Sequence, residues 1–483
     1  MSPALRVALV HYHLRPGGVG SVMGHHQAAV LAQKGIQCVI LAGSNPACMD
    51  SVSIVPELDY TGPRVSPATL ARRIHSAARK ALGGPPDIWH VHNHALGKNP
   101  VLTLAIHRMA QAGERLLLQI HDFAEDGRPS NYKHLLNSVS DGDPGRLAAI
   151  LYPQAPNIEY AVLNRRDQSF LLQAGFDPER VHVLPNPIPD TPDSTLPPPP
   201  PPGPALFLYP TRALRRKNLG ELLLWAATAG RDEVYGTTLA PTNPSDRHPY
   251  ERWKHLAFRL RLPVQFELGA SGTPLAHLVQ KSRAVITTSI AEGFGLAFLE
   301  PWVLGRPLVG RSLPELTSEF EETGVRLSAL YDHLWIPASW LGSGSLEQTV
   351  RSRLASFWEA YGRRIPPDAV ERALDSMTRG KLVDFGRLDE PMQERIIRKL
   401  AGSSELRSHL RPHHPWLKYP SQADLAKNRD TIRQHYGLTR HGERLAAIYE
   451  PLLQSRAGTP AAPSHEKLLA AFLAPERFYL LRT

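Results

Sequence analysis

The chain has 483 residues, of which 42% are hydrophobic and 21% are charged, so it is expected to be a globular protein of two or three domains. Its two cysteines, Cys38 and Cys48, exclude a disulfide framework and predict a reducing, cytoplasmic location. No apolar run is long enough to cross a bilayer, and residues 1–10 lead into a predicted strand without the parts of a secretion signal.

The net charge of +10 points to an anionic partner. Nucleic acid, an anionic membrane surface and a phosphate-bearing substrate would each suit it. The sequence has no nucleic-acid-binding motif, so nucleic acid is not expected as a partner. Peripheral contact with an anionic membrane stays open, and the sequence leaves homo-oligomerisation open as well.

The N-terminal region has the pattern of a parallel sheet crossed by helices. Residues 7–10 are a short apolar strand, and a glycine-bearing loop with Gly17 and Gly18 follows. A helical pattern over 21–34 then leads to a second strand at 36–42. This strand–loop–helix–strand unit is typical of Rossmann-like α/β folds. The loop lacks the GxGxxG spacing, so a dinucleotide fingerprint is not supported.

Two later strands in this half end in histidines. Residues 87–91 and 116–120 are predicted to be strands, and they are followed by His92 and His121. Ligands of open α/β sheets bind beyond the carboxyl ends of the strands, so these ends predict a cleft. His121 is the main candidate, because its imidazole could donate a hydrogen bond to a sugar hydroxyl or to an acceptor. A purely structural histidine is the alternative.

A metal site is not predicted. His92, His94 and His121 fit none of the compact zinc spacings, and no cysteine joins them. Asp141 and Asp143 imitate a metal-binding Asp-x-Asp, but they lie in a Gly/Pro-rich stretch and are predicted to form a turn.

Residues 125–132 are polar and are predicted to form a mobile loop at the mouth of the cleft. Arg128, Asn131, Tyr132 and Lys133 are candidates for acceptor binding, and the two cations would suit an anionic acceptor. Solvation of an ordinary loop is the alternative interpretation.

The stretch with the strongest functional signal follows a predicted buried strand at 284–289. The turn Glu292-Gly293-Phe294-Gly295 comes next, and then a predicted helix that carries Glu300 and ends at Gly305. Free backbone N–H groups and the helix dipole make such a turn an anion site. Each glutamate can accept hydrogen bonds from two neighbouring hydroxyls, so the pair could hold the two sugar rings of a nucleotide-sugar on either side of its diphosphate.

A second signal follows the predicted strand at 206–209. Arg212 and Lys217 stand between this strand and the next helical pattern. Positive charge is disfavoured at a helix N-terminus, so cations in this position indicate an anionic ligand.

Glu292 and Glu300 form a Glu-x7-Glu pattern around Gly-Phe-Gly, and Lys217 follows Arg212 by five residues. In these motifs the chain resembles the retaining glycosyltransferases of the GT-B fold, of the family 4 type. The resemblance covers about residues 5–310 and 428–453. Pro301 departs from the family pattern, which has a helix former there, and it requires residue 301 to lie in the first turn of the helix.

The resemblance implies roles for the candidate residues. Arg212 and Lys217 would bind the diphosphate and stabilise the charge that it gains, as catalytic residues do. Glu292 and His121 would contact the transferred sugar, and Glu300 would bind the ribose. The other implied positions belong to the donor site (Gly17, Gly18, Gly293, Phe294 and Gly295) or to the acceptor site (His92, Arg128, Asn131 and Tyr132).

The implied fold class is α/β of the GT-B type, with two Rossmann-like domains facing across a cleft and a helical elaboration in the C-terminal half. The predicted parts, in chain order, are a Rossmann-like acceptor-side domain (1–190), a proline-rich linker (191–204), a Rossmann-like donor domain (205–427) with a helical insertion (317–420), and closing helices that return to the first domain (428–483).

The implied function is transfer of a hexose from a nucleotide-diphosphate sugar to a hydroxyl acceptor, with retention of anomeric configuration and without a metal or other cofactor. A nucleotide-sugar epimerase or a glycoside phosphorylase on the same fold stays open, as does a non-catalytic nucleotide-sugar-binding protein. The sequence does not indicate which sugar, nucleotide or acceptor is used.

Overall fold

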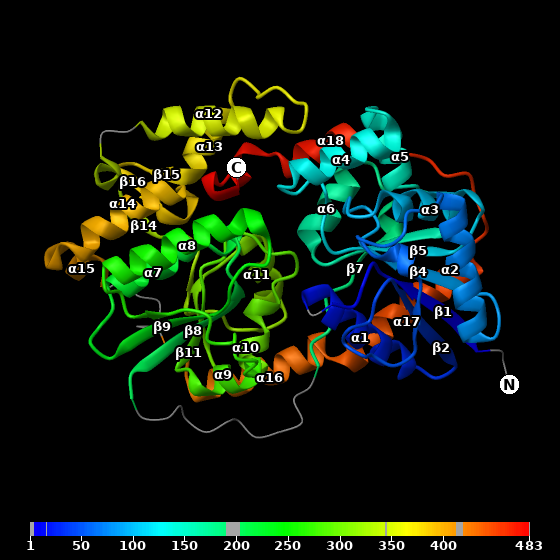
Figure 1. The fold of residues 1–483 in the computed structure, drawn as a ribbon, viewed down its shortest axis with the longest axis horizontal. Coiled ribbons are helices and arrows are strands. Elements are labelled where there is room, and N and C mark those ends of the chain that lie inside the picture. The colour runs from blue at the N-terminus through cyan, green and yellow to red at the C-terminus, as the bar shows by residue number, and fades with distance from the viewer. Residues whose placement is uncertain (1–3, 16, 190–202, 343–344, 412–418, 483) are drawn as a thin grey trace. The chain divides into compact units, whose positions relative to one another are not determined.

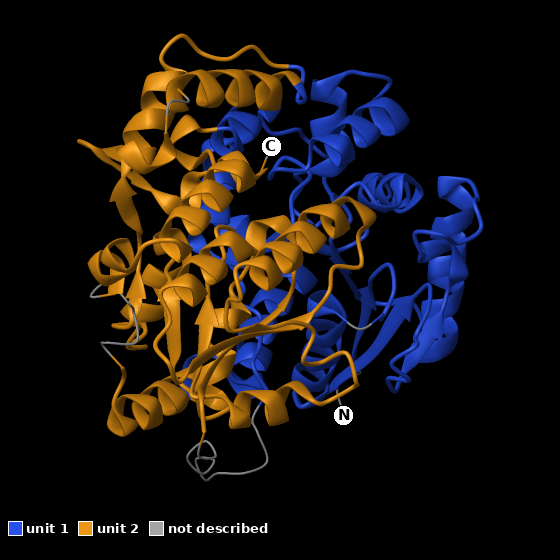
Figure 2. Ribbon diagram, turned by 60° about the vertical axis from the view of Figure 1, so that its left-hand side comes forward, with its two compact units in different colours: residues 1–189, 360–362, 434–473 blue, residues 190–359, 363–433, 474–483 orange. Residues whose placement is uncertain are grey.

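The computed structural model describes residues 4–15, 17–189, 203–342, 345–411 and 419–482 (Figure 1). The chain divides into two compact units (Figure 2). Unit 1 consists of residues 1–189, 360–362 and 434–473, and unit 2 of residues 190–359, 363–433 and 474–483. The predicted linker at 191–204 lies outside the described residues except for its last two positions.

Unit 1 is built on a seven-stranded sheet in the order β3-β2-β1-β4-β5-β6-β7. Every neighbouring pair is parallel, as the sequence predicted. The strands predicted at 36–42 and 116–120 have the predicted ends. The strands are β1 Leu5–Val10, β2 Ile36–Ala42, β3 Val52–Ile54, β4 Ile88–His92, β5 Leu116–Ile120, β6 Ile158–Val162 and β7 Val181–Val183.

The helices of unit 1 begin at residues that suit helix N-termini. Ser66, Asn99 and Asn164 each accept a hydrogen bond from the backbone of the first turn that follows them, and a proline comes next in the first two cases. The helices are α1 Gly18–Leu31, α2 Pro67–Leu82, α3 Pro100–Gln111, α4 Pro129–Ser140, α5 Pro144–Leu151, α6 Arg165–Gln173, α17 Leu438–Gln454 and α18 His465–Phe472.

The C-terminal part of the chain contributes to the core of unit 1. Helix α17 packs against α1, and its Leu445, Tyr449 and Leu452 are buried in one cluster with Val7 and Ile40 of the sheet. The helices predicted at 428–436 and 442–453 correspond to α16, Gln422–Tyr436, and to α17.

Unit 2 contains a second parallel sheet, in the order β10-β9-β8-β11-β12-β13. Both units therefore have the Rossmann-like α/β architecture that the sequence predicted. The strands are β8 Ala205–Arg212, β9 Glu233–Leu239, β10 Val264–Gln265, β11 Ala284–Thr287, β12 Leu308–Arg311 and β13 Leu330–Tyr331. The helices that follow these strands are α7 Leu219–Ala227, α8 Pro244–Arg259, α9 Leu275–Lys281, α10 Glu300–Val303 and α11 Pro314–Glu322.

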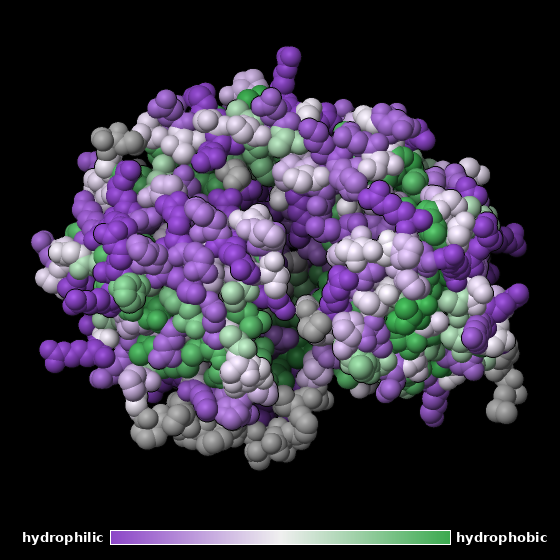
Figure 3. All heavy atoms as spheres, viewed as in Figure 1, coloured by the Kyte–Doolittle hydropathy of each residue, from purple (hydrophilic) through white to green (hydrophobic). Residues whose placement is uncertain are grey.

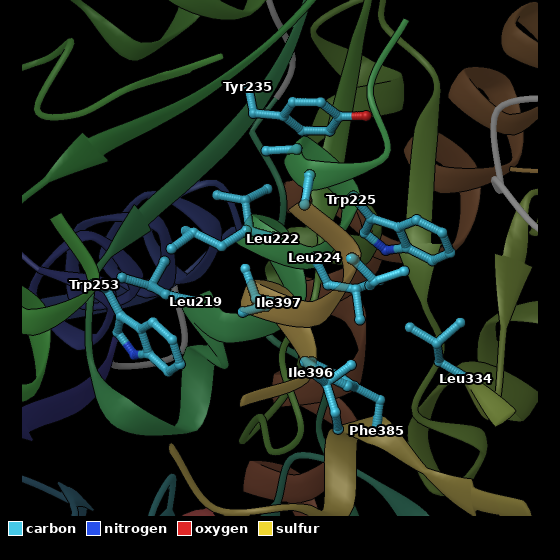
Figure 4. Packing of buried hydrophobic residues seen from close by; sticks show 14 of the residues in the cluster. Leu219, Leu222, Leu224, Trp225, Tyr235, Trp253, Leu334, Phe385, Ile396 and Ile397 are labelled. Atoms are coloured by element: carbon cyan, nitrogen blue, oxygen red, sulfur yellow. The ribbon is translucent and has the colours of Figure 1, made fainter. Parts of the chain in front are cut away.

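The core of unit 2 surrounds α7, whose residues are all buried. Leu222 and Trp225 of this helix share one cluster with Tyr235 of the sheet and with Ile396 and Ile397 (Figure 4). The last two residues belong to α14, Glu390–Ala401, which packs on α7. Helix α7 is buried all round because the sheet lies on one side of it and α14 on the other, and apart from Glu221 it carries no charged side chain.

The region 317–420 contains helices, as the sequence predicted. Besides its helices it contains a three-stranded antiparallel sheet in the order β14-β16-β15. Strand β13 moreover extends the main sheet of unit 2. The elements after β13 are β14 Trp335–Pro337, α12 Leu346–Glu359, α13 Ala369–Met377, β15 Thr378–Arg379, β16 Leu382–Asp384, α14 and α15 Ser404–Leu410.

A buried arginine links this small sheet to the main one. The Arg311 side chain, 1% exposed, donates from Nη2 to Glu221 Oε2 at 2.8 Å and to Asp384 Oδ1 at 2.9 Å. Burial alone would raise the pKa of Asp384, but Arg311 outweighs it and holds that pKa below its usual value. The hydroxyl of Tyr331 also donates to Glu221, at 2.6 Å. Two carboxylates and one guanidinium thus form a fully paired buried network.

The surface has ordinary character. On the face shown in Figure 3, hydrophilic side chains cover most of the surface and hydrophobic residues lie in small groups between them. Among the described residues, none of the helices combines the length and the apolar composition needed to cross a membrane.

We expect Arg311→Met to lower the free energy of unfolding of unit 2 by about 3–5 kcal/mol, because it leaves Glu221 and Asp384 buried without their cation. Urea unfolding followed by tryptophan fluorescence would measure this loss. Arg351→Ala is the matched control, because it breaks an exposed pair with Glu347 on α12 and should cost about 0.5 kcal/mol or less. Equal unfolding midpoints for the two variants would contradict the role given to Arg311.

Candidate functional site

Lys217 and Glu292 form an ion pair at the carboxyl edge of the unit 2 sheet. Lys217 ends the short 3-10 helix η3, Arg215–Lys217, which follows β8, and Glu292 lies beyond the end of β11. The two side chains are 14% and 10% exposed. Burial would raise the pKa of Glu292, but Lys217 and Arg216 outweigh it and keep the pKa below its usual value. The carboxylate is therefore ionised at neutral pH.

Hydroxyl groups of the sheet hold the backbone of Lys217 in place. Tyr209 Oη donates to the Lys217 carbonyl at 3.1 Å, and Thr288 Oγ1 donates to the same carbonyl at 3.0 Å. Ser289 Oγ donates to the Arg216 carbonyl at 3.3 Å. The small hydroxyl residues at the end of the predicted strand 284–289 therefore bind η3 to the sheet. These hydrogen bonds fix the position of the Lys217 backbone.

Two arginines accompany this pair. Arg216 Nη1 lies 3.3 Å from Glu292 Oε2 and 3.0 Å from the Ala291 carbonyl oxygen. The sequence indicated no donor-site role for Arg216, because three adjacent basic residues do not reveal which of them turns inward. Arg212 is the last residue of β8 and is half-buried, and within the described part of the chain its guanidinium makes no ion pair. The site therefore has more cations than its single carboxylate neutralises.

Helix α14 supports the same segment from the region 317–420. Arg215 forms two hydrogen bonds with Glu390, Nε to Oε1 at 2.6 Å and Nη2 to Oε2 at 2.9 Å. Gln393 Nε2 donates to Asn218 Oδ1 at 2.9 Å. Asn218 has a positive φ of 51° and joins η3 to α7. This region therefore holds both ends of the basic segment in place.

The turn after Glu292 is tighter than the sequence suggested. The predicted continuous helix is instead a 3-10 turn at Leu296–Phe298 followed by α10, Glu300–Val303. Gly295 has a φ of +91°, and a Cβ there would lie 2.8 Å from Phe298 Cδ2, so the turn requires glycine. The Phe294 side chain is 5% exposed and packs against Phe320, so only the backbone at position 294 could face a ligand.

Glu300 is the first residue of α10. Pro301 occupies the first turn, where a missing N–H costs nothing, so the expectation for this proline is confirmed. Burial raises the pKa of the Glu300 carboxyl. Within the described residues the carboxylate makes no side-chain hydrogen bond, so both of its oxygens remain available to hydroxyl donors.

In unit 1, Gly17 and Gly18 begin helix α1, which lacks both a capping side chain and an acidic residue in its first turn. A Cβ at Gly18 would meet nothing within 4 Å, and one at Gly17 would meet only the Arg15 carbonyl oxygen at 4.0 Å. The folded chain itself therefore does not require glycine at either position. At Gly20, by contrast, a Cβ would lie 2.5 Å from that same oxygen.

His121 and His92 come together at the ends of β5 and β4, with His121 Nε2 2.9 Å from His92 Nδ1. Asn93 positions this pair: its φ is +58°, and its Oδ1 accepts from the backbone N–H of His121 at 2.7 Å. Tyr12 Oη donates to the Asn93 carbonyl at 2.7 Å. His92 is fully buried and contacts His121, and its predicted role in acceptor binding stays a prediction.

The predicted loop at 125–132 is a turn up to Arg128, and from Pro129 onward it is the start of helix α4. The backbone N–H of Arg128 donates to Tyr361 Oη at 2.7 Å, its guanidinium pairs with Asp122, and Tyr132 is buried against Tyr361. Asn131 donates to the Leu96 carbonyl at 3.0 Å. These side chains have structural partners that the sequence could not show. The predicted turn at Asp141 and Asp143 is confirmed, since these residues end α4 and cap α5.

Six buried histidines form a cluster in unit 1 that the sequence did not predict. They come from five places in the chain, and ring contacts or hydrogen bonds connect them: His11, His26, His90, His92, His121 and His441. His26, His90 and His92 each offer a nitrogen within 4.8 Å of the others. From the sequence, the histidines considered for a metal site are His92, His94 and His121 instead. His94 belongs to a different contact, with the Leu151 carbonyl.

Burial, the largest cause, lowers the pKa of His11 and His90 to about 3, and likewise that of His441 to about 3 and that of His121 to about 4. Unfolding releases these rings to a pKa near 6.5, so below pH 6.5 the unfolded chain binds more protons. We therefore expect stability to be complete above pH 6.5 and to fall as the pH drops from 6.5 towards 4, by up to about 1.4 kcal/mol per pH unit for each ring.

Urea midpoints measured between pH 7.5 and 5.5 would test this expectation. His441→Gln should reduce the slope by about one proton, since it removes one of the buried rings. A stability that stays flat over this range would contradict a neutral cluster.

Known proteins resemble this chain in sequence or in fold. No family model matches the chain. Mannosylglucosyl-3-phosphoglycerate synthase of Petrotoga mobilis is 27% identical over 325 residues, which are 60% of this chain and 62% of that enzyme's length. HepE of Anabaena, solved with UDP and glucose, covers 92% of this chain and 99% of its own, at 12% identity and a TM-score of 0.52.

Two further solved structures agree with this likeness. A glycosyltransferase of Rickettsia africae covers 93% of this chain and 99% of its own, at 15% identity and a TM-score of 0.52. The catalytic domain of starch synthase IV of Arabidopsis thaliana, bound to ADP and acarbose, covers 94% and 100%, at 13% identity and a TM-score of 0.51. The two parallel-sheet units and these likenesses show that the chain has the GT-B fold.

Proposed function

We propose that the chain transfers a hexose from a nucleotide-diphosphate sugar to a hydroxyl acceptor, with retention at the anomeric carbon. The observation that carries this proposal is the group of cations at the carboxyl edge of the unit 2 sheet. Arg212, Arg216 and Lys217 lie at or just beyond the end of β8, and Glu292, beyond the adjoining β11, pairs with Arg216 and Lys217. Beyond the carboxyl ends of strands is where open α/β sheets bind their ligands.

In this proposal the diphosphate of the donor replaces Glu292 as the main partner of Lys217. A diphosphate brings more negative charge than one carboxylate, and the backbone of Lys217 is already fixed by Tyr209 and Thr288. Little reorganisation is then needed at the moment when charge develops, which is the condition for effective electrostatic stabilisation. Glu292 is thereby released to accept hydrogen bonds from the hydroxyls of the transferred sugar.

Glu300 binds the ribose in this proposal. Its position at the start of α10 and its lack of a side-chain hydrogen bond within the described residues support this role. A carboxylate with two available oxygens suits a pair of vicinal hydroxyls. His121, oriented by His92 and by the amide of Asn93, contacts the transferred sugar.

The chemical step breaks the bond between the anomeric carbon and the diphosphate oxygen. The acceptor oxygen forms the new bond to the same carbon on the same face, and the departing phosphate takes the acceptor's proton. The negative charge that gathers on the leaving diphosphate is stabilised by Lys217 and Arg212. The protein acts by positioning and charge stabilisation, without a covalent intermediate.

For the acceptor we propose an anionic hydroxy compound of the phosphoglycerate class. The relative from Petrotoga mobilis is named as the synthase of a glycosylated 3-phosphoglycerate. The net charge of +10 suits such a substrate. Because the chain spans 62% of that relative's length, the acceptor requires its own test.

The deciding experiment measures release of nucleotide from UDP-, GDP- and ADP-hexoses by the purified protein. Each donor is offered alone, with free phosphate, with glycerate, and with 3-phosphoglycerate or its glucoside. We expect one donor to release nucleotide, and an anionic acceptor to stimulate that release. Conversion of the donor without an acceptor would identify an epimerase, and stimulation by free phosphate alone would identify a phosphorylase. NMR of the product would establish whether the anomeric configuration is retained.

Arg212→Ala and Lys217→Ala should each lower kcat/KM by about 100- to 1000-fold, because each removes one preorganised positive charge from the leaving diphosphate. Isothermal calorimetry should show weaker binding of the nucleotide diphosphate by the same variants. Arg351→Ala removes one exposed cation from α12 and should keep full activity. Unchanged turnover in both site variants would refute the diphosphate assignment.

A further inference from the structure

Three histidines of the buried cluster offer nitrogens to one small space. His26 comes from α1, and His90 and His92 come from the same face of β4. The ring of His26 stands edge-on to the other two, with centroids 5.6 Å from His90 and 5.1 Å from His92. One nitrogen from each ring lies within 4.8 Å of the others, and all three side chains are completely buried.

Two of these rings have a nitrogen that the fold leaves unpaired. His26 Nε2 and His92 Nε2 are buried and have no hydrogen-bond partner among the described residues. Buried polar atoms nearly always have a partner, and leaving one without a partner costs about 1–3 kcal/mol. Two unpaired nitrogens in neighbouring rings therefore need an explanation. A ligand that accepts electron pairs from both of them would supply one.

The opposite nitrogens are all hydrogen-bonded. His26 Nδ1 lies 3.2 Å from His441 Nε2, His92 Nδ1 lies 2.9 Å from His121 Nε2, and His90 Nε2 lies 2.8 Å from Gln119 Oε1. If each ring donates its single proton outward along these contacts, every inner nitrogen keeps a lone pair. Metal-bound histidines are held in this way, since the second ring nitrogen donates to a neighbouring acceptor.

We propose that His26, His90 and His92 bind one divalent zinc ion. Three neutral imidazoles without a carboxylate suit zinc, whose bonds to nitrogen are about 2.0–2.1 Å long. Around a tetrahedral ion the ligand nitrogens stand about 3.3 Å apart, so the three rings would close by up to about 1.5 Å. At His90 the ligating atom is Nδ1, which accepts from Tyr449 Oη at 2.9 Å in the structure and exchanges that hydroxyl for the ion.

The site is distinct from the donor-binding residues of unit 2, and it holds whether or not the proposed transfer reaction does. The site depends only on the positions of three side chains from α1 and β4. Its outer contacts reach His121 and His441, so the ion would also fix which nitrogen of His121 carries the proton. The ion would thus have a structural and a positioning role.

The test uses the full chain without a histidine tag, stripped with a chelator and dialysed. Zinc is titrated in by calorimetry, and cobalt is titrated in a parallel visible spectrum. We expect one zinc ion per chain and the intense d–d bands of tetrahedral cobalt bound by nitrogen. Zinc should also raise the melting temperature in proportion to the logarithm of its concentration above Kd. No binding by the folded wild-type chain would overturn the proposal.

Variants identify the ligands. His26→Gln and His92→Gln should abolish the cobalt bands while circular dichroism shows a folded chain, and His441→Gln should weaken binding by about 10- to 100-fold. His94→Gln is the matched control, because His94 is equally buried in unit 1 but bonds to the Leu151 carbonyl. Equal zinc binding by the His92 and His94 variants would overturn the assignment. If a ligand variant does not fold, the stoichiometry and cobalt spectrum of the wild type decide.

Discussion

The ion pair between Lys217 and Glu292 is the interaction on which the candidate donor site depends. It joins the segment after β8 to the segment after β11, and both side chains are largely withdrawn from water. Withdrawing a lone charge from water is costly, so each residue lowers the cost of burying the other. Because Arg216 shares the same carboxylate, the local charge stays positive. The pair therefore keeps the site folded and leaves an unmet attraction for an anion.

The residues around this pair hold the backbone of η3 in place. The hydroxyls of Tyr209, Thr288 and Ser289 donate hydrogen bonds to carbonyls of η3. Helix α14 binds Arg215 and Asn218 at the two ends of the same segment. Unit 1 uses the same device with an amide, since Asn93 bridges the ends of two strands and orients His121. In both units, polar side chains from the strands or from their ends position the candidate residues through hydrogen bonds with the backbone.

The sequence predicted what depends on local pattern. Apolar runs such as 36–42 and 116–120 gave the strands with their observed ends, and Pro301 correctly required the start of a helix. The antiparallel sheet within 317–420 could not be predicted, because its strands have only two or three residues. Such strands are too short to show an alternating hydrophobic pattern. Arg216 could not be distinguished from Arg215, because the choice of partner depends on Glu292 and Glu390, which are distant in sequence.

The histidine cluster illustrates the same limit. Each of its members stands in a strand or helix or directly follows a strand, and only the fold brings them together. His90 and Tyr449 are hydrogen-bonded although they are 359 residues apart. Burial of so many imidazoles is possible only when each stays neutral, so the stability of this part of the core depends on pH.

That contact between α17 and β4 also bears on how the protein is made. The first strands of unit 1 leave the ribosome early, but the helix that covers them is encoded after the whole of the unit 2 sheet. During synthesis the core that contains Val7 and Ile40 therefore waits, with an apolar surface uncovered, until Leu445 and Leu452 arrive. Unit 2 has all strands of its main sheet before that moment. Of the two main sheets, the one whose strands are translated first is thus the one that is covered last, and during that interval unit 1 would depend most on chaperones.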